Sequence, residues 1–237
     1  MFKRPTLIRA AAMLFGFVAA LSVAHAQTPA AGNFVEGKQY FLIEPAQPGT
    51  VDGKIEVVEI FSYGCPACNA FQATMKKIHD TLPANAVLTY LPASFNTAEN
   101  WPLFQRAYFT AQALGIIDKV HDATFDAIWK DDGSLRITDP VTHQLVKPMP
   151  TIEDVAKFYA RFGAKPEDVV ATSSSFAVNA KMKRADSLLR AYGVDSTPTI
   201  VVGGKYRFTG RSVGSLEQVV PLVQYLIAKE AGAKPAN

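Results

Sequence analysis

Residues 55–68 read Ile-Glu-Val-Val-Glu-Ile-Phe-Ser-Tyr-Gly-Cys-Pro-Ala-Cys. The first seven residues are mostly apolar and rich in β-branched side chains, which predicts a buried strand. Cys65 and Cys68, at the end of the stretch, are the two cysteines of the 237-residue chain. Two thiols that stand alone at this spacing suggest redox chemistry.

A helix is expected directly after the first cysteine, from Pro66 to Leu82. Phe71, Met75 and Ile78 recur there at helical spacing and give the helix one buried stripe. A second strand is expected at residues 86–91. The order strand, helix, strand is the start of a parallel sheet in an α/β fold.

The middle of the chain contains no convincing strand. Its apolar periodicity and capping residues predict a helical subdomain, with helices at residues 101–114, 118–129, 151–162, 166–173 and 176–192. The sheet resumes after it.

Two more strands, at residues 199–202 and 206–209, flank Gly203-Gly204-Lys205, which is typical of a β-hairpin. A final helix is expected at 216–229. Residues 27–53 are predicted to be mostly loop, with an extended piece at 39–43. The fold class is therefore α/β, with a sheet interrupted by helices.

Residues 1–26 resemble a secretory signal peptide. Three basic residues precede an apolar stretch of 14 residues, Ala10 to Val23, and Ala24-His25-Ala26 has the form of a cleavage site. The stretch is shorter than the ~20 residues that a membrane-spanning helix needs. We expect cleavage before Gln27 and a soluble exported protein, with an uncleaved anchor as the alternative.

Cleavage would also remove the excess of positive charge. The signal holds three of the 24 basic residues and none of the 21 acidic ones, so 21 of each remain and the net charge is zero. No contiguous basic stretch is left that would favour a nucleic acid or an anionic lipid as partner.

The position of the dithiol favours reactivity over a structural role. A disulfide that closes a four-residue loop stabilises by only about 1.9 kcal/mol in the loop-entropy account. A cysteine at the start of a helix faces free backbone N–H groups, which favour its thiolate, and Pro66 suits the first helical position. Cys65 is therefore predicted to be the nucleophile, and the more buried Cys68 the resolving thiol.

Two other uses of the dithiol remain open. An inert disulfide staple is one alternative in an exported protein. A structural zinc site is the other, but it normally needs four ligands, and the chain has four histidines, one of them in the signal peptide and none in a pair of the usual spacing.

Four segments, residues 34–40, 59–68, 113–120 and 193–206, resemble the DsbA family of bacterial thiol:disulfide oxidoreductases. The resemblance covers nearly the whole predicted mature chain. It implies a thioredoxin-like fold with an inserted helical domain.

The domains implied are a thioredoxin-like domain in two parts, 27–97 and 186–237, around a helical domain at 98–185. The activity implied is donation of the Cys65–Cys68 disulfide to exported proteins with free cysteines in the periplasm. A membrane oxidase like DsbB would reoxidise the enzyme. No metal or organic cofactor is implied, and a monomer is expected.

The resemblance also assigns roles to three supporting residues. Thr197-Pro198 matches the cis proline that faces the dithiol, where the backbone of Thr197 would pair with an extended substrate. Glu59 matches a buried acid that exchanges a proton with Cys68. A strand covered on both faces would bury this carboxylate and raise its pKa.

The chain departs from the family pattern in three places. Ala67 stands where the best-known motif has histidine, so Cys65 is predicted to be less acidic and the enzyme less oxidising. Thr197 stands where valine is common before the proline. The second strand, with Leu88, Thr89 and Tyr90, lacks the lysine that can pair with the buried acid.

Four residues, Tyr63, Phe95, Tyr192 and Pro198, are candidates for an apolar peptide groove beside the dithiol. The three histidines outside the signal, His79, His121 and His143, have no partner pattern and are interpreted as surface or loop residues.

Two rival functions stay open: a reductase or isomerase on the same fold, and a folding helper that binds unfolded chains while its dithiol is idle.

Overall fold

The protein is described by a computed structural model for residues 34–232. The predicted signal peptide, residues 1–26, lies outside the described residues. Within residues 34–232, no helix is both long enough and apolar enough to cross a membrane.

The described residues form a sheet and two groups of helices. The strands are β1 (Phe41–Leu42), β2 (Thr50–Val51), β3 (Lys54–Phe61), β4 (Ala86–Pro92), β5 (Thr199–Val202) and β6 (Tyr206–Thr209). The helices are α1 (Pro66–Thr81), α2 (Trp101–Ala113), α3 (Ile117–Trp129), α4 (Ile152–Ala160), α5 (Pro166–Ser173), α6 (Phe176–Ala191), α7 (Gly210–Val213) and α8 (Val219–Gly232), with a 3-10 turn η1 (Leu216–Gln218) before α8.

Each predicted helix and strand is present. The short elements β2 and α7 were not expected, because two to four residues are too few to show a periodicity. The predicted last helix is also different, since its first turn is the 3-10 turn η1 and the α-helix runs on to Gly232.

The long strand β3 lies in the middle of the sheet. It pairs in parallel with β4 on one side and antiparallel with β5 on the other, and the order continues through β6 to β1. The predicted strand-helix-strand unit is therefore confirmed. Glu59 on β3 lies opposite Tyr90 of β4 and Ile200 of β5.

The turn between β5 and β6 depends on its two glycines. Gly203 and Gly204 have φ angles of 60° and 62°, in the region that favours glycine. A Cβ atom on Gly204 would lie 2.2 Å from the carbonyl oxygen of Gln47. The hairpin predicted from these residues is confirmed, and the close approach also fixes the loop before β2.

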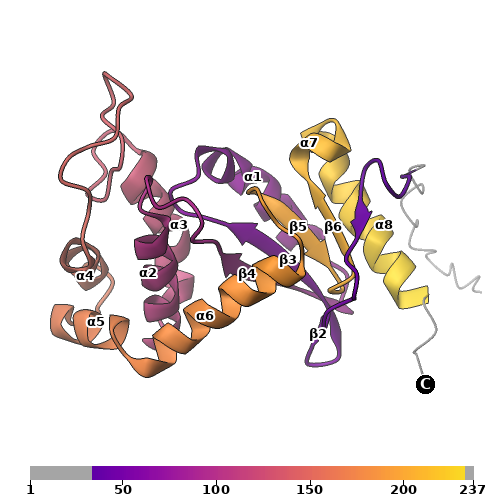
Figure 1. Cartoon of the computed structure of the whole chain (residues 1–237), viewed down its shortest axis with the longest axis horizontal. Helices are drawn as coiled ribbons and strands as arrows, with labels where there is room; N and C mark the ends of the chain where they lie inside the picture. The colour runs from indigo at the N-terminus through magenta and orange to yellow at the C-terminus, as the bar shows by residue number, and fades with distance from the viewer. Residues whose placement is uncertain (1–33, 233–237) are drawn as a thin grey trace, which may run out of the picture.

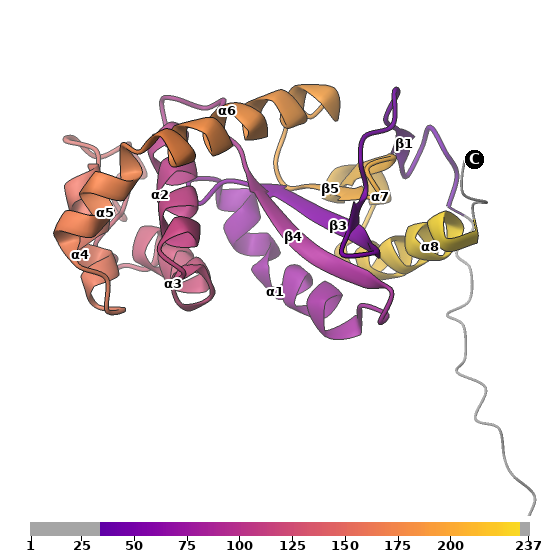
Figure 2. The ribbon, with the colours of Figure 1, turned by 90° about the horizontal axis from the view of Figure 1, so that it is seen from below.

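Helices cover both faces of the sheet (Figures 1 and 2). Figure 2 shows α1 and α8 on one face and α6 on the other, while α2, α3, α4 and α5 gather beyond one end of the strands. These helices lie between β4 and β5 in the sequence, so the fold is thioredoxin-like with a helical insertion. The predicted domain boundary between residues 185 and 186 falls inside α6, and the division into domains stays a prediction.

Two hydrophobic clusters hold this arrangement together. We call the first the sheet core; it joins one sheet face to α1 and α8 and includes Val57, Phe71, Met75, Leu222 and Leu226. We call the second the insert core; it joins the other sheet face and the end of β3 to the inserted helices and includes Phe61, Phe104, Tyr108, Phe125 and Tyr159. Both Cys65 and Cys68 belong to the insert core.

Candidate active site

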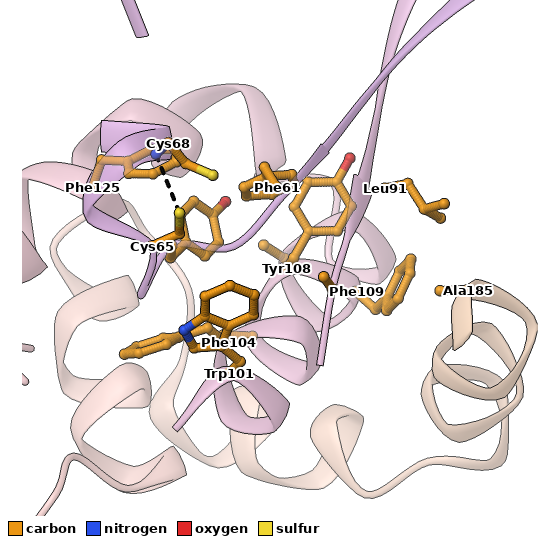
Figure 3. Packing of buried hydrophobic residues seen from close by; sticks show 14 of the residues in the cluster. Phe61, Cys65, Cys68, Leu91, Trp101, Phe104, Tyr108, Phe109, Phe125 and Ala185 are labelled. Atoms are coloured by element: carbon orange, nitrogen blue, oxygen red, sulfur yellow. Dashed lines mark hydrogen bonds between the residues drawn. The ribbon is translucent and has the colours of Figure 1, made fainter. Parts of the chain in front are cut away.

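Cys65 occupies the cap position at the N-terminus of α1. Its backbone is extended, with φ −91° and ψ 116°, and Pro66 follows at the start of the helix. The backbone N–H of Cys68 donates a hydrogen bond of 3.3 Å to the sulfur of Cys65, drawn as a dashed line in Figure 3. The predicted geometry is confirmed: Cys65 accepts a hydrogen bond from one of the N–H groups that a helix start leaves free.

Gly64 lets the turn before Cys65 approach the helical insertion closely. A Cβ atom on Gly64 would lie 2.9 Å from the Trp101 ring, at the start of α2. Trp101 in turn stacks against Phe95, with ring centroids 5.0 Å apart. The dithiol therefore lies against an aromatic wall supplied by the insert core (Figure 3).

The pKa values of the two thiols are shifted in opposite directions. The pKa of Cys65 is lowered to about 6, first by the hydrogen bond from the Cys68 thiol and then by bonds from Thr197 and the backbone, although burial opposes the change. The pKa of Cys68 is raised, first by burial and then by its bond to Cys65 and by nearby negative charge. Cys65 is 5% exposed and Cys68 is not exposed at all. The geometry therefore favours a thiolate at Cys65 beside a thiol at Cys68.

Glu59 is completely buried beside this pair, as expected. Burial raises the pKa of its carboxyl to about 8, and negative charge on Cys65 adds to the effect. Neither carboxyl oxygen has a hydrogen-bond partner within residues 34–232. On the neighbouring strand, Thr89 donates its hydroxyl to Glu56 instead, at 2.7 Å. Glu59 is thus a proton-holding group without a cation beside it.

The peptide bond between Thr197 and Pro198 is cis. The backbone carbonyl oxygen of Thr197 lies 3.6 Å from the sulfur of Cys65, from which it accepts a hydrogen bond when Cys65 is protonated. Residues 132 positions apart therefore meet at one sulfur atom.

The prediction of an apolar peptide groove is wrong for two of its four residues. Tyr63, two residues after β3, and Tyr192, at the C-terminal cap of α6, are both buried in the insert core. Phe95 is 48% exposed. Pro198 lines a groove of about 300 Å³ that also reaches Ala67, the residue just before Cys68.

The interpretation of His121 as a surface or loop residue is wrong as well, whereas His79 and His143 are exposed. His121 lies on the buried face of α3, and its Nδ1 atom is 2.9 Å from the hydroxyl of Tyr63. Burial lowers the pKa of this imidazole to about 4, so it is neutral at physiological pH. Its spacing of four and seven residues from Phe125 and Ile128 was a helical signal for burial.

A second contact from α3 also reaches the turn before the dithiol. The Trp129 indole donates a hydrogen bond of 2.8 Å to the backbone oxygen of Tyr63. Together with His121, it fixes Tyr63, two residues before Cys65, to the helical insertion. Both residues were missed from sequence because their partners are 58 and 66 positions away.

No group of three or more His, Cys, Asp or Glu side chains within residues 34–232 is placed to hold a metal ion. The described site brings together two sulfur atoms, one buried carboxyl and a backbone carbonyl.

Comparisons with known proteins agree with this geometry. A scan against protein-family models gives no match. Thiol:disulfide interchange protein DsbA of Pseudomonas aeruginosa is 36% identical over 228 residues, which cover 96% of each chain. The protein of that name from Pseudomonas syringae pv. tomato is 36% identical over 226 residues, 95% of this chain and 94% of the relative.

Solved structures of DsbA proteins are also similar to this chain. The crystal structure of Pseudomonas aeruginosa DsbA is similar with a TM-score of 0.71 at 37% identity, and covers 84% of this chain and 95% of that one. The oxidoreductase DsbA from Xylella fastidiosa has a TM-score of 0.71 at 34% identity, with 84% of this chain and 98% of that one covered.

Proposed function

This chain belongs to the DsbA family of thiol:disulfide interchange proteins, and from that premise we propose that Cys65 is the sulfur at which it exchanges disulfides with exported proteins. The chain is a protein-disulfide oxidoreductase, and its substrates are proteins with cysteines. The observation that carries the assignment to Cys65 is its low pKa at the start of α1, beside a buried thiol whose pKa is raised.

The proposed reaction begins with the oxidised enzyme. A substrate thiolate attacks the sulfur of Cys65, the Cys65–Cys68 bond breaks, and its electron pair leaves on Cys68. A second substrate thiolate then attacks the substrate sulfur of the mixed disulfide, and Cys65 leaves as a thiolate. The substrate loses two electrons and gains a disulfide, and the two enzyme sulfurs gain those electrons. The low pKa of Cys65 makes it the better leaving group in the second step.

The low pKa of Cys65 also favours transfer of the disulfide from the enzyme to its substrate. Its pKa is lowered from 9.0 to about 6, so the thiolate stabilises the folded reduced protein fully above pH 9, and this stabilisation is lost as the pH falls through about 6. A stabilised reduced form makes the disulfide oxidising, and DsbA is itself the standard example of this effect. Donation is therefore favoured over reduction or isomerisation.

Glu59 is proposed to handle the proton of Cys68. Cys68 leaves as a thiolate in a buried environment that disfavours the charge. The Glu59 carboxyl has a pKa of about 8, so it is mostly protonated at pH 7 and can supply a proton. Thr197 and Pro198 are proposed to hold the substrate, with the main chain of Thr197 pairing with an extended segment beside Cys65.

We also propose where the reaction takes place and which kind of partner restores the disulfide. Residues 1–26 would direct the chain to the periplasm and be removed there. A membrane oxidase like DsbB would then restore the disulfide, and the enzyme would act as a monomer without a cofactor.

The proposal is tested by replacing each cysteine separately. In Cys65→Ser, oxidation of a dithiol peptide should fall at least about a thousandfold, because the attacked sulfur is gone. In Cys68→Ser, the Cys65 thiolate should attack the disulfide of an oxidised peptide, release one peptide sulfur as a thiolate and stay bound to the other as a mixed disulfide, because no Cys68 thiol is present to resolve it. Mass spectrometry detects this adduct. Full activity of Cys65→Ser in cells would replace this function with that of a folding helper.

The resting redox state separates the oxidase from a reductase or isomerase. Trapping of free thiols in intact cells should find Cys65 and Cys68 mostly in the disulfide form. A mostly reduced pair would favour the reductase.

A further inference from the structure

The groove beside the dithiol extends past the residues that the proposed exchange uses. The groove measures about 300 Å³ and runs from Ala67 and Phe71 on α1, past the turn at residues 196–198, to α7 and Leu216. Thr197 lines the groove and its backbone oxygen also contacts the sulfur of Cys65, so the groove lies next to the reacting atom. A segment of substrate that is attached at Cys65 can therefore extend into it.

The floor of the groove is largely apolar. Ala67, Phe71, Pro198 and Leu216 contribute to its lining, and Leu216 is 50% exposed. Such a surface suits apolar side chains of an unfolded chain, whose burial is favourable without any fixed sequence. The floor alone provides little discrimination between substrates.

Arg211 is the one charged residue among those that line the groove. It lies on the short helix α7, whose start is held by a capping box between Thr209 and Ser212. The Arg211 side chain is exposed, and it forms no ion pair with any side chain of residues 34–232. The nearest acid along the turn, Asp195, accepts a hydrogen bond from Ser196 instead. The guanidinium is available to a ligand.

We propose that Arg211 gives this enzyme a preference for substrate segments that carry a carboxylate side chain a few residues from the reacting cysteine. The inference rests on the proposed function and adds a substrate class to it. A guanidinium binds a carboxylate through two parallel hydrogen bonds, which makes it more selective than a diffuse positive charge. With Ala67 uncharged between the cysteines, Arg211 supplies the positive charge of the groove lining.

The expected effect is modest, because the contact is open to water. Exposed ion pairs contribute little and bidentate ones somewhat more, so we expect about a three- to tenfold higher kcat/KM for the acidic substrate. The preference should weaken at high salt, because the Debye length falls from about 10 Å at 0.1 M to about 3 Å at 1 M.

The test uses dithiol peptides that are identical except at one position, which holds Glu, Gln or Lys and is moved stepwise along both sides of the first cysteine. The oxidised full-length mature enzyme is mixed with each peptide, and the rate of peptide oxidation is measured. At one or more positions, the wild type should oxidise the Glu peptide faster than the Lys peptide. Since each ratio is taken within one protein, a general loss of activity cancels.

Arg211→Glu should reverse the ratio, so that the Lys peptide becomes the faster substrate, and Arg211→Lys should keep its direction. Arg184→Glu makes the same charge change on exposed α6 and should keep both the ratio and the rates of the wild type. Equal rates for all peptides with the wild type, or a Glu preference that persists in Arg211→Glu, would overturn the inference and leave disulfide exchange intact. If the wild type oxidises none of the peptides, the proposed function itself fails.

Discussion

The sheet core and the insert core differ in how they treat polar groups. Within residues 34–232, the sheet core consists mainly of aliphatic side chains and phenylalanines from β3, β5, β6, α1 and α8, and its Tyr40 hydroxyl accepts a hydrogen bond from Lys229. The insert core contains the two thiols and the buried Tyr63–His121 pair, and Glu59 lies beside it without a hydrogen-bond partner. Unpaired buried polar groups cost stability, so their place next to the dithiol indicates a function. From this difference we infer that the sheet core mainly stabilises the fold, whereas the insert core sets the pKa values of the two thiols.

The largest effect is expected from truncating the sheet core. Leu226 is fully buried on α8. Leu226→Ala should lower the free energy of unfolding by about 2–5 kcal/mol, because it removes buried methyl groups and leaves a cavity. Denaturant unfolding measures the loss. The pKa of Cys65 should not change, and a clear shift in an ultraviolet titration of the thiolate would show that the two cores do not act separately.

Glu59→Gln should raise the free energy of unfolding, whereas Leu226→Ala should lower it. The folded pKa of Glu59 is raised from 4.5 to about 8, so the folded state binds more protons than the unfolded state in this window, and stability falls as the pH rises through it. Removing the ionisable group should therefore increase the free energy of unfolding at pH 7 by about 2–3 kcal/mol. The gain should shrink as the pH falls toward 4.5 and vanish below it, where the carboxyl is protonated in both the folded and the unfolded state.

The oxidised protein is the right sample for this measurement, because its cysteines do not titrate. Glu56→Gln is the matched control on the other face of β3, where the carboxylate accepts a hydrogen bond from Thr89. The control should lose about 1 kcal/mol. A Glu59→Gln protein that is less stable than wild type at pH 8 would contradict the buried, unpaired state of this carboxyl.

A double-mutant cycle tests the Tyr63–His121 contact. His121→Phe should cost about 1–2 kcal/mol, because the buried Tyr63 hydroxyl loses its partner. Adding Tyr63→Phe removes that hydroxyl, so the double variant should regain most of the loss. Simple additivity of the two single changes would mean that the contact contributes no coupling to the insert core.

The smallest effect concerns Ala67, one of the two residues between the cysteines. Ala67 is exposed, so a histidine fits there without overpacking. Ala67→His should lower the pKa of Cys65 from its value of about 6. The decrease should be about one unit or less, which corresponds to at most about 30 mV in reduction potential. Equilibration with glutathione measures the potential, and Ala70→His, exposed on α1, is the control. Unchanged acidity and potential in Ala67→His would remove the reason for expecting a weaker oxidant here.

Local sequence was sufficient wherever a local interaction decides the structure. Pro66 after Cys65 predicted the start of α1, and Gly203-Gly204 predicted the hairpin, because both depend on the backbone preferences of one or two residues. The dithiol was predicted to be the reactive pair for the same reason, since the two cysteines are three residues apart. By contrast, β2 and α7 were too short to show a pattern, and His121 was misplaced because its partner is remote.

The sequence by itself determined the longer elements, their order and the spacing of the two cysteines. Only the tertiary structure decided that Glu59 is unpaired, that Thr197 reaches Cys65, that Tyr63 and Tyr192 face inward, and that Arg211 shares a groove with Ala67. Backbone conformation depends on neighbours in the chain. Burial, acidity and shared surfaces depend on residues that only packing brings together.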